Sequence, residues 1–432
     1  MYHFCTTSYL SCNGTKVSDT KAKHPPRPYT RPSRAGIRVM TASDQPNPRP
    51  RLLLLIPHLG GGGAEQVTAQ LARGLSSQKY DLHLALITQT ADAPELAYSR
   101  LPPWVTVHPL GARRVRSAAL PLLQLLRGLR PQLILSSMFH LNFLVLLLRP
   151  FLGFPVRILI RQNATASSAL AELPRHNRLL YRTLYRRADC VLCQSDAMAR
   201  DLAENFAVPG NRISVLPNPI DIDAIRSAKP AQSEAWPNSG PHLFAVGRLS
   251  HEKGFDLLLR SLSHVRRQFP SADLLIAGSG PEEPLLKALC CTLSLDAAVR
   301  FLGHVAAPAS YFSAAALFVL SSRHEGLPNA LLEAAAVGLP IVTTPASDGL
   351  VELVDRQTGV WLASASTAQE LADTLITALT ALEPGQRFHH AFVEPFALKP
   401  ALAAWEALID RFLAETSTGG ATVQHSSPVV SA

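Results

Sequence analysis

Residues 242–254 read His-Leu-Phe-Ala-Val-Gly-Arg-Leu-Ser-His-Glu-Lys-Gly, and residues 317–333 read Leu-Phe-Val-Leu-Ser-Ser-Arg-His-Glu-Gly-Leu-Pro-Asn-Ala-Leu-Leu-Glu. Each stretch begins with an apolar run that predicts a buried strand, and a third such run, Asp273–Ala277, precedes Gly278-Ser279-Gly280. In open α/β sheets, ligands bind outside the carboxyl ends of the strands. Arginine, lysine, glycine turns and paired carboxylates at that place predict a pocket for a phosphate-bearing, hydroxyl-rich ligand, and a sugar nucleotide is the natural candidate.

Two glutamates, Glu325 and Glu333, flank the start of a predicted helix. Pro328 suits a first helical turn because its missing N–H would have no partner there, and Gly338 ends the alanine- and leucine-rich run Asn329–Val337. Helical side chains lean toward the N-terminus, so Glu333 can reach the free backbone N–H groups that suit a pyrophosphate. A pyrophosphate would repel both carboxylates, which makes ribose and sugar hydroxyls their predicted targets. The alternative is a surface helix with ordinary acidic residues.

This segment resembles the donor-binding half of glycosyltransferase family 4, whose members are retaining enzymes of the GT-B architecture. Gly247-Arg248 through Lys253-Gly254 is similar to the family's diphosphate-binding pair, and Glu325-Gly326-Leu327-Pro328-Asn329 through Glu333 is similar to its two-glutamate motif. The resemblance implies that Arg248, Lys253 and Glu325 are catalytic, that Glu325 lies by the donor sugar and that Glu333 holds the nucleotide ribose. It is specific over residues 240–362 and extends more weakly back to residue 51.

Four further loops follow predicted strands. Gly60–Gly63 with Glu65 resembles the family's Gly-Gly-Ala-Glu turn, His140 with Asn142 and Arg161 with Asn163 follow two later strands, and Gly278-Ser279-Gly280 resembles the nucleotide-side turn. The implied donor-binding residues are Gly247, Gly278, Gly280, Gly326, Leu327, Pro328, Asn329 and Glu333. The implied residues on the acceptor or donor-sugar side are Gly62, Gly63, His140, Arg161 and Asn163. A tight strand–helix turn, a helix cap or a packing role is the alternative for each of these loops.

The chain of 432 residues is long enough for two domains, and short apolar strands alternate with helical patterns as in doubly wound parallel sheets. We therefore expect an α/β fold of GT-B type, with two Rossmann-like domains facing a central cleft and a C-terminal helix crossing back to the first domain. The expected segments are a disordered extension (1–49, with a possible false start before Met40), an acceptor domain (50–220), a linker (221–240), a nucleotide-sugar domain (241–395), a closing helix (396–414) and a flexible tail (415–432).

Several residue patterns bear on metal, redox and compartment. Six cysteines are scattered without a disulfide framework, so a reducing cytoplasm is expected. Cys190 and Cys193 lie on opposite faces of one predicted strand, so their CxxC spacing does not predict a metal or redox site. Asp221-Ile222-Asp223 matches the DxD by which transferases of another fold hold a divalent cation, but it lies in the predicted linker. Because Arg248 and Lys253 supply diphosphate neutralisation, we expect no metal and no cofactor.

The net charge of +9 is concentrated in the first half, where one acid, Glu172, lies between Arg100 and Arg187 among many arginines. This imbalance predicts an anionic partner. Nucleic acid is not expected, because aromatic interleaving and recognisable motifs are absent. In Arg175–Arg187, arginines at helical spacing beside Leu179, Leu180, Tyr181, Leu184 and Tyr185 predict a helix at an anionic membrane surface. Leucines that pack inward beneath solvated arginines are the alternative.

Together these patterns predict a cytoplasmic, membrane-peripheral transferase at the inner face of the cytoplasmic membrane. The resemblance implies retaining transfer of a hexose or N-acetylhexosamine from a nucleotide sugar to a glycan or polyprenyl-phosphate-linked acceptor in cell-surface polysaccharide synthesis. UDP is the expected nucleotide of the donor only because it is the most frequent one in the family that the chain resembles. The alternatives are a GT-B sugar-nucleotide epimerase, a phosphorylase, or a non-catalytic homologue that binds sugar nucleotides.

Overall fold

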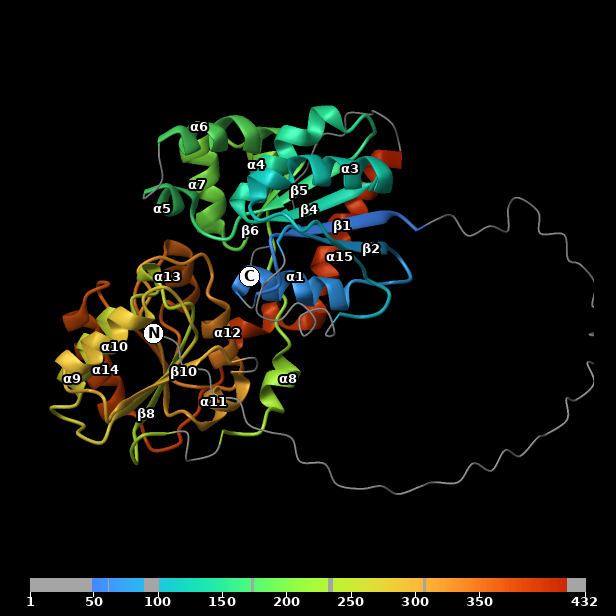
Figure 1. Cartoon of the computed structure of the whole chain (residues 1–432). Helices are drawn as coiled ribbons and strands as arrows, with labels where there is room; N and C mark the ends of the chain where they lie inside the picture. Colours follow the sequence, from blue (N-terminus) through green and yellow to red (C-terminus); the bar gives the residue numbers. More distant parts are fainter. Residues whose placement is uncertain are drawn as a thin grey trace, which may run out of the picture. The chain divides into compact units, whose positions relative to one another are not determined.

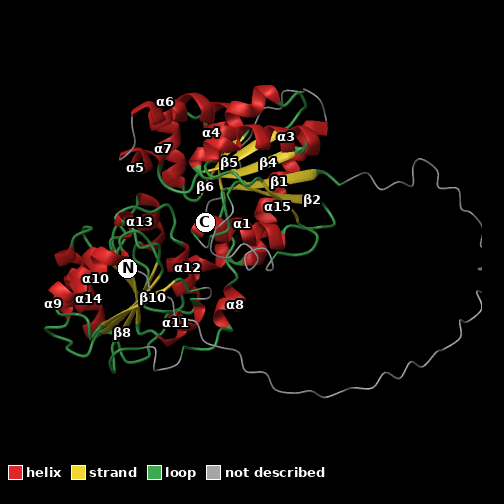
Figure 2. Cartoon of the chain, viewed as in Figure 1, coloured by secondary structure: helices red, strands yellow, loops and turns green. Residues whose placement is uncertain are grey.

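A computed structural model describes residues 49–60, 62–88, 101–171, 175–231, 236–305 and 308–417. Residues 1–48 and 418–432, to which most of the predicted N-terminal extension and tail belong, lie outside the described residues. The described chain forms two parallel sheets, each with helices between its strands (Figures 1 and 2). The prediction of two doubly wound α/β domains is therefore confirmed.

The first sheet has the strand order β3-β2-β1-β4-β5-β6-β7, so the order reverses direction between β1 and β4. Its strands are β1 (Arg51–Ile56), β2 (Asp81–Leu86), β3 (Thr106–Pro109), β4 (Leu133–Ser137), β5 (Arg157–Arg161), β6 (Cys190–Cys193) and β7 (Ile213–Val215). The helices of this half are α1 (Gly63–Gly74), α3 (Ala119–Leu129), α4 (Phe139–Leu148), α5 (Ala166–Ala171), α6 (Arg175–Leu184) and α7 (Asp196–Phe206). Short 3₁₀ turns are η1 (Val115–Ala118), η2 (Arg149–Phe151), η3 (Tyr185–Arg187) and η4 (Gly210–Arg212).

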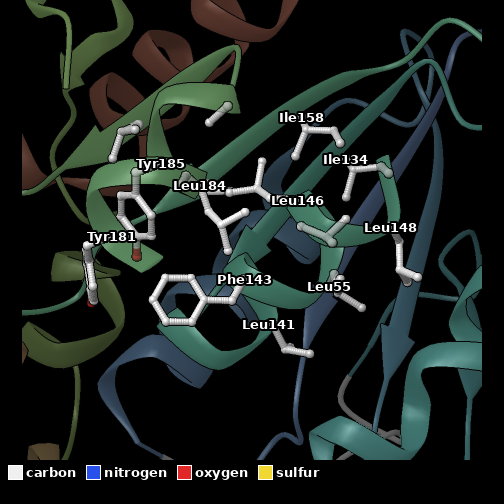
Figure 3. Packing of buried hydrophobic residues seen from close by; sticks show 14 of the residues in the cluster. Leu55, Ile134, Leu141, Phe143, Leu146, Leu148, Ile158, Tyr181, Leu184 and Tyr185 are labelled. Carbon is white, nitrogen blue, oxygen red and sulfur yellow. The ribbon is translucent and has the colours of Figure 1, made fainter. Parts of the chain in front are cut away.

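Both faces of the first sheet are covered, which is why its strands are continuous apolar runs rather than alternating ones. In β1, Leu53 and Leu55 pack in the core beneath α3, α4, α6 and α7, part of which is drawn in Figure 3. Leu52, Leu54 and Ile56 point to the opposite face and pack against α1 and the C-terminal helix. The period of two along the strand thus divides its side chains between two cores.

The second sheet has the order β10-β9-β8-β11-β12-β13 and reverses direction between β8 and β11. Its strands are β8 (His242–Val246), β9 (Asp273–Ala277), β10 (Val299–Gly303), β11 (Leu317–Leu320), β12 (Ile341–Thr343) and β13 (Val360–Leu362). Its helices are α9 (Phe255–Val265), α10 (Glu283–Thr292), α11 (Ala309–Ala314), α12 (Asn329–Ala336), α13 (Asp348–Val354) and α14 (Ala368–Ala381), with the 3₁₀ turns η6 (His251–Lys253) and η7 (Ala391–Phe396). A short helix, α8 (Ile222–Arg226), lies within the stretch predicted as a loose linker.

The last helix, α15 (Leu398–Ser417), returns to the first sheet as predicted. Trp405, Leu408, Ile409 and Phe412 are buried in the same core as the α1 side of β1. Tyr80 donates its hydroxyl hydrogen to Asp410 at 2.5 Å, which adds a polar contact at the edge of this core. Among the described residues, no helix is long and apolar enough to cross a membrane.

Candidate functional site

The loops that follow β8 and β11 lie side by side at the point where the strand order of the second sheet reverses. Such reversals are where doubly wound sheets hold ligands. The two loops are in direct contact: the Ser321 hydroxyl donates to the Lys253 carbonyl at 3.0 Å, and the next residue, Gly254, has φ +61°. A Cβ on Gly254 would lie 2.1 Å from the Ser321 carbonyl oxygen, so only glycine permits this approach.

Within this junction, Lys253 and Glu325 form a direct ion pair. Lys253 Nζ lies 2.5 Å from Glu325 Oε1, and the Ser322 hydroxyl donates to the same oxygen at 2.7 Å. Glu325 is further held by its backbone N–H, which donates to the Ala346 carbonyl at 3.1 Å. The sequence predicted separate targets for the two side chains, a diphosphate and sugar hydroxyls, and did not predict that they bind each other.

Arg248 is exposed and, among the described residues, has no hydrogen bond or ion pair to fix its guanidinium. Its charge acts on Glu252: burial would raise the pKa of this carboxyl, but bonds from Ser250 and the backbone, together with the charges of Lys253 and Arg248, lower it overall. Arg248 is therefore a cation beside the Lys253 loop that remains available to an anionic ligand.

The turn after β9 packs closely against the backbone of the Gly247–Arg248 segment and of the residue that follows it. Gly278 has φ +136°, and a Cβ there would lie 1.8 Å from the Gly247 carbonyl oxygen. A Cβ on Gly280 would lie 2.3 Å from the Leu249 carbonyl oxygen, and the Leu249 N–H donates to the Ser279 carbonyl at 3.0 Å. These glycines allow the two backbone segments to approach each other closely. They therefore hold the Gly247–Arg248 segment in place, in addition to any contact with a ligand.

Glu333 lies on the second turn of α12, where it is partly buried. Burial raises the pKa of its carboxyl to about 7. Within the described part of the chain no hydrogen bond or ion pair satisfies this carboxyl. A carboxyl kept partly out of water without a partner is unfavourable unless a ligand supplies one. The polar hydrogens of a ribose diol fit that requirement.

The loop before α12 also touches the first sheet. Leu327, which is buried, donates its N–H to Gln194 Oε1 at 2.9 Å, and a Cβ on Gly326 would lie 2.4 Å from the Asn163 carbonyl oxygen. Pro328 precedes the first helical residue, and Asn329 Nδ2 donates to the Gly63 carbonyl at 3.3 Å. Gly63, Asn163 and Gln194 follow the carboxyl ends of β1, β5 and β6, respectively. The predicted donor motif therefore contacts the predicted acceptor-side loops.

Arg161 is buried, with 2% of its surface exposed, and its hydrogen bonds join these first-sheet loops. It donates to Asn163 Oδ1 and to Asn218 Oδ1, each at 2.6 Å. Burial lowers the pKa of Arg161 to about 10, and the nearby negative charge of Glu65 opposes that shift, so the guanidinium stays charged at neutral pH. Glu65 is itself buried at 4% exposure and folds back over Gly62, the residue that caps α1.

His140 and Asn142, predicted to lie on a loop, both lie in the first turns of α4. His140 is exposed, its ring lies against that of Phe139 at a tilt of 33°, and none of the contacts described for it involves another candidate residue. Asn142 is fully buried and donates to the Arg161 carbonyl at 3.0 Å, which makes it a packing residue. The sequence-based reasoning missed Gln194 and Asn218 as site residues. Gln194 follows a strand end, so the same rule would have found it; the proline-flanked Asn218 gave no such signal.

The DxD segment has a local structural role. Asp221 caps α8 by accepting the Ala224 N–H at 3.0 Å, and Asp223 lies in the first turn of the same helix. Both aspartates border a cavity of about 480 Å³ that also includes residues of α1, η7 and α15. None of the candidate donor residues lines this cavity.

The predicted apolar surface of α6 and η3 is wrong. Tyr181, Leu184 and Tyr185 are 1%, 3% and 0% exposed and pack in the core with Phe143 (Figure 3). The helical spacing correctly separated an apolar face from a basic face, but the apolar face packs in the core and does not meet solvent. Leu179 is the large apolar residue of this helix that is exposed, at 63%, beside the exposed arginines Arg178, Arg182, Arg186 and Arg187.

Comparison with known families matches both halves of the chain. Residues 61–224 match the family described as Glycosyltransferase Family 4, and residues 240–381 match the family described as Glycosyl transferases group 1. The two matches together cover the second sheet and all of the first sheet except β1. They place the predicted donor residues in one matched segment and the predicted acceptor-side loops in the other.

Individual relatives agree. The chain is 28% identical over 317 residues, 70% of this chain and 83% of the other, to an N-acetylgalactosamine-N,N'-diacetylbacillosaminyl-diphospho-undecaprenol 4-alpha-N-acetylgalactosaminyltransferase of Campylobacter jejuni. An uncharacterized glycosyltransferase of Methanocaldococcus jannaschii is 30% identical over 181 residues, 41% of this chain and less than half, 44%, of that protein. The structure of Anabaena Alr3699/HepE in complex with UDP and glucose shares the fold at a TM-score of 0.67 and 19% identity, covering 85% of this chain and all of that one.

Proposed function

The chain belongs to glycosyltransferase family 4, and we propose that it transfers a hexose or N-acetylhexosamine from a UDP-sugar to a glycan or polyprenyl-phosphate-linked acceptor, with retention of anomeric configuration, in cell-surface polysaccharide synthesis. The observation that carries this proposal is the grouping of Arg248, Lys253, Glu325 and Glu333 at the strand-order reversal of the second sheet. Two cations there suit a diphosphate, and two carboxyls suit the hydroxyls on either side of it.

The diphosphate of the donor is bound by Arg248 and Lys253, and the nearby glycine turns leave room for its oxygens. Preorganised cations of this kind stabilise the charge that develops on a leaving group. As the bond between the sugar C1 and the diphosphate oxygen breaks, the acceptor hydroxyl attacks C1 from the same face. The departing phosphate oxygen takes the acceptor's proton, and the chain needs no covalent nucleophile.

The nucleotide and acceptor assignments draw on relatives. The Anabaena protein of similar fold was solved with UDP and glucose, and the name of the Campylobacter relative specifies a diphospho-undecaprenol-linked acceptor. These support a UDP donor and a lipid-linked acceptor for this chain. The basic first half, with its exposed arginines on α6 and η3, supports attachment at the anionic inner face of the cytoplasmic membrane. Neutralisation by Arg248 and Lys253 supports transfer without a divalent metal, and no nucleic-acid partner is proposed.

A donor screen tests the proposal. The purified protein is incubated with UDP-, GDP- and ADP-sugars, with and without polyprenyl-phosphate-linked glycans, and the products are identified by mass spectrometry. Acceptor-dependent transfer from a UDP-sugar, with the anomeric configuration preserved by NMR, is the expected result. Epimerised sugar without acceptor would identify an epimerase, a requirement for inorganic phosphate a phosphorylase, and UDP binding without turnover a non-catalytic homologue.

A further inference from the structure

A continuous line of hydrogen bonds joins the donor motif to the first sheet. Asn329 donates to the Gly63 carbonyl at 3.3 Å, Asn218 Nδ2 donates to Asn329 Oδ1 at 2.8 Å, and Arg161 donates to Asn218 Oδ1 at 2.6 Å. Arg161 then donates to Asn163 Oδ1 at 2.6 Å. The line connects the turn after β1, the start of α12, the segment between the two sheets and the end of β5.

Asn218 is the member of this line that belongs to neither sheet. It is 2% exposed, and both ends of its amide are used, the oxygen by Arg161 and the nitrogen by Asn329. A buried amide satisfied at both ends resists rotation, because turning it over would leave two buried polar groups unpaired.

The backbone of Asn218 is also held. It lies between Pro217 and Pro219, and a residue before proline is restricted to extended conformations. The Pro217 carbonyl accepts the indole N–H of Trp405 at 2.9 Å, and Trp405 is buried in the core beneath α15. Asn218 is thus fixed to the first sheet and its returning helix, and it reaches from there to α12.

We propose that Asn218 is a positioning residue for the transfer reaction: it sets the start of α12, and with it the loop Glu325–Asn329, against Arg161 and the Gly63 turn. The inference rests on the proposed transferase function. Arg248 and Lys253, the groups assigned to the diphosphate, make none of the bonds in this line, so the main effect of Asn218 is on the alignment of the donor with the acceptor side rather than on the affinity for the nucleotide.

The experiment compares Asn218→Ala with the wild-type enzyme by UDP titration calorimetry, steady-state kinetics and thermal unfolding. Misplacement of reacting groups by about an ångström costs on the order of 10²-fold in rate. We expect kcat to fall between about tenfold and 10²-fold, while the Kd for UDP changes by less than about threefold. In a double-mutant cycle, Asn218→Ala and Asn329→Ala combined should lower kcat by less than the product of the two single effects, because both remove the same bond.

Two further variants separate positioning from folding. Asn218→Asp keeps an acceptor for buried Arg161 but offers no N–H to Asn329, so it should fold and still lose rate. Gln132→Ala removes a side-chain amide that accepts the Arg51 N–H at 2.7 Å, at the opposite end of the first sheet, and should lower the melting temperature without lowering kcat.

The outcomes are distinct. Three outcomes overturn the inference and leave Asn218 a structural residue. They are folded Asn218 variants that retain wild-type kcat, loss of folding in both Asn218 variants, and a fall in kcat that Gln132→Ala also shows for the same fall in melting temperature. A wild-type protein that neither binds UDP nor turns over any donor overturns the proposed function as well, and is recognised before any variant is measured.

Discussion

Lys253 and Glu325, separated by 71 residues in sequence, form an ion pair of 2.5 Å where the second sheet reverses its strand order. Glu325 therefore competes with a diphosphate for the Lys253 ammonium. Changing Glu325→Gln removes a negative charge beside the leaving group, so UDP should bind several-fold more tightly, since opposite charges at this distance are worth on the order of 1 kcal/mol or more near a protein surface. The rate of transfer should fall, because the group assigned to the donor sugar is altered.

UDP titration calorimetry and steady-state kinetics measure these two effects on the same Glu325→Gln protein. Ser322→Ala is the matched comparison, because it removes the other bond to Glu325 Oε1 and leaves the carboxylate in place. Weaker UDP binding in Glu325→Gln would contradict the competition between carboxylate and diphosphate.

Arg248→Ala and Lys253→Ala test the leaving-group stabilisation. Each should lower kcat by on the order of 10²-fold or more, the scale for removing one preorganised charge-stabilising group. Both side chains belong to a loop beyond a strand end, so circular dichroism and melting temperature should stay near those of the wild type. Arg260→Ala, an exposed arginine of α9, controls for the loss of charge alone. A folded Arg248→Ala enzyme with the wild-type rate would show that the donor site lies elsewhere.

The sequence predicted both sheets and the returning helix because apolar strand runs and helical periods recur along the whole chain. It also predicted that the loops after β8 and β11 adjoin, because the end of a parallel strand fixes where the following loop begins. It did not predict the Lys253–Glu325 pair or the two bonds of Asn218, since these depend on contacts between loops distant in sequence. It misassigned Tyr181, Leu184 and Tyr185, because an amphipathic period does not state what covers the apolar face.

Glu333 gives the apo protein a pH-dependent stability. Its folded pKa of about 7 lies above the ordinary value of 4.5, so the folded state binds the proton more tightly than the unfolded state. Protonated Glu333 therefore contributes to folding stability at low pH, and this contribution is lost as pH rises from about 4.5 to about 7. Glu333→Gln should therefore raise the melting temperature relative to the wild type more at pH 8 than at pH 5, while weakening UDP binding.

Thermal unfolding of the ligand-free protein at both pH values measures this difference. Glu204→Gln, a substitution of the same kind on the exposed face of α7, is the control. An equal effect of Glu333→Gln at pH 5 and pH 8 would contradict a raised pKa. Unchanged UDP affinity would contradict the ribose assignment.

Transfer should not require a divalent metal. Excess EDTA should leave most of the activity, because Arg248 and Lys253 supply the charge that a metal would otherwise supply. Asp221→Ala removes the cap of α8 and should cost about 1 kcal/mol of stability, measured by denaturant titration, without lowering kcat. Complete loss of activity in EDTA that Mn²⁺ restores, together with an inactive but folded Asp221→Ala enzyme, would assign the DxD a metal after all.

Membrane attachment through α6 and η3 should be chiefly electrostatic. Because Tyr181, Leu184 and Tyr185 are buried, the exposed surface offers Arg178, Arg182 and Arg186 with Leu179 beside them. Each exposed basic residue near an anionic surface contributes about 1 kcal/mol, and salt screens that attraction. Co-sedimentation with vesicles should therefore rise with phosphatidylglycerol content, fall steeply with salt, and drop when Arg178, Arg182 and Arg186 are changed together to glutamine.

A matched triple variant separates position from net charge in this membrane assay. Arg260, Arg267 and Arg356 are exposed arginines of the second half, and changing them to glutamine removes the same charge from a different surface. This variant should sediment like the wild type. Leu179→Ser should weaken binding only slightly, since one leucine buries little area compared with three arginines. Equal losses in both triple variants would mean that net charge, not the α6 surface, drives attachment. Binding indifferent to lipid charge, salt and all substitutions would make a soluble acceptor the better hypothesis.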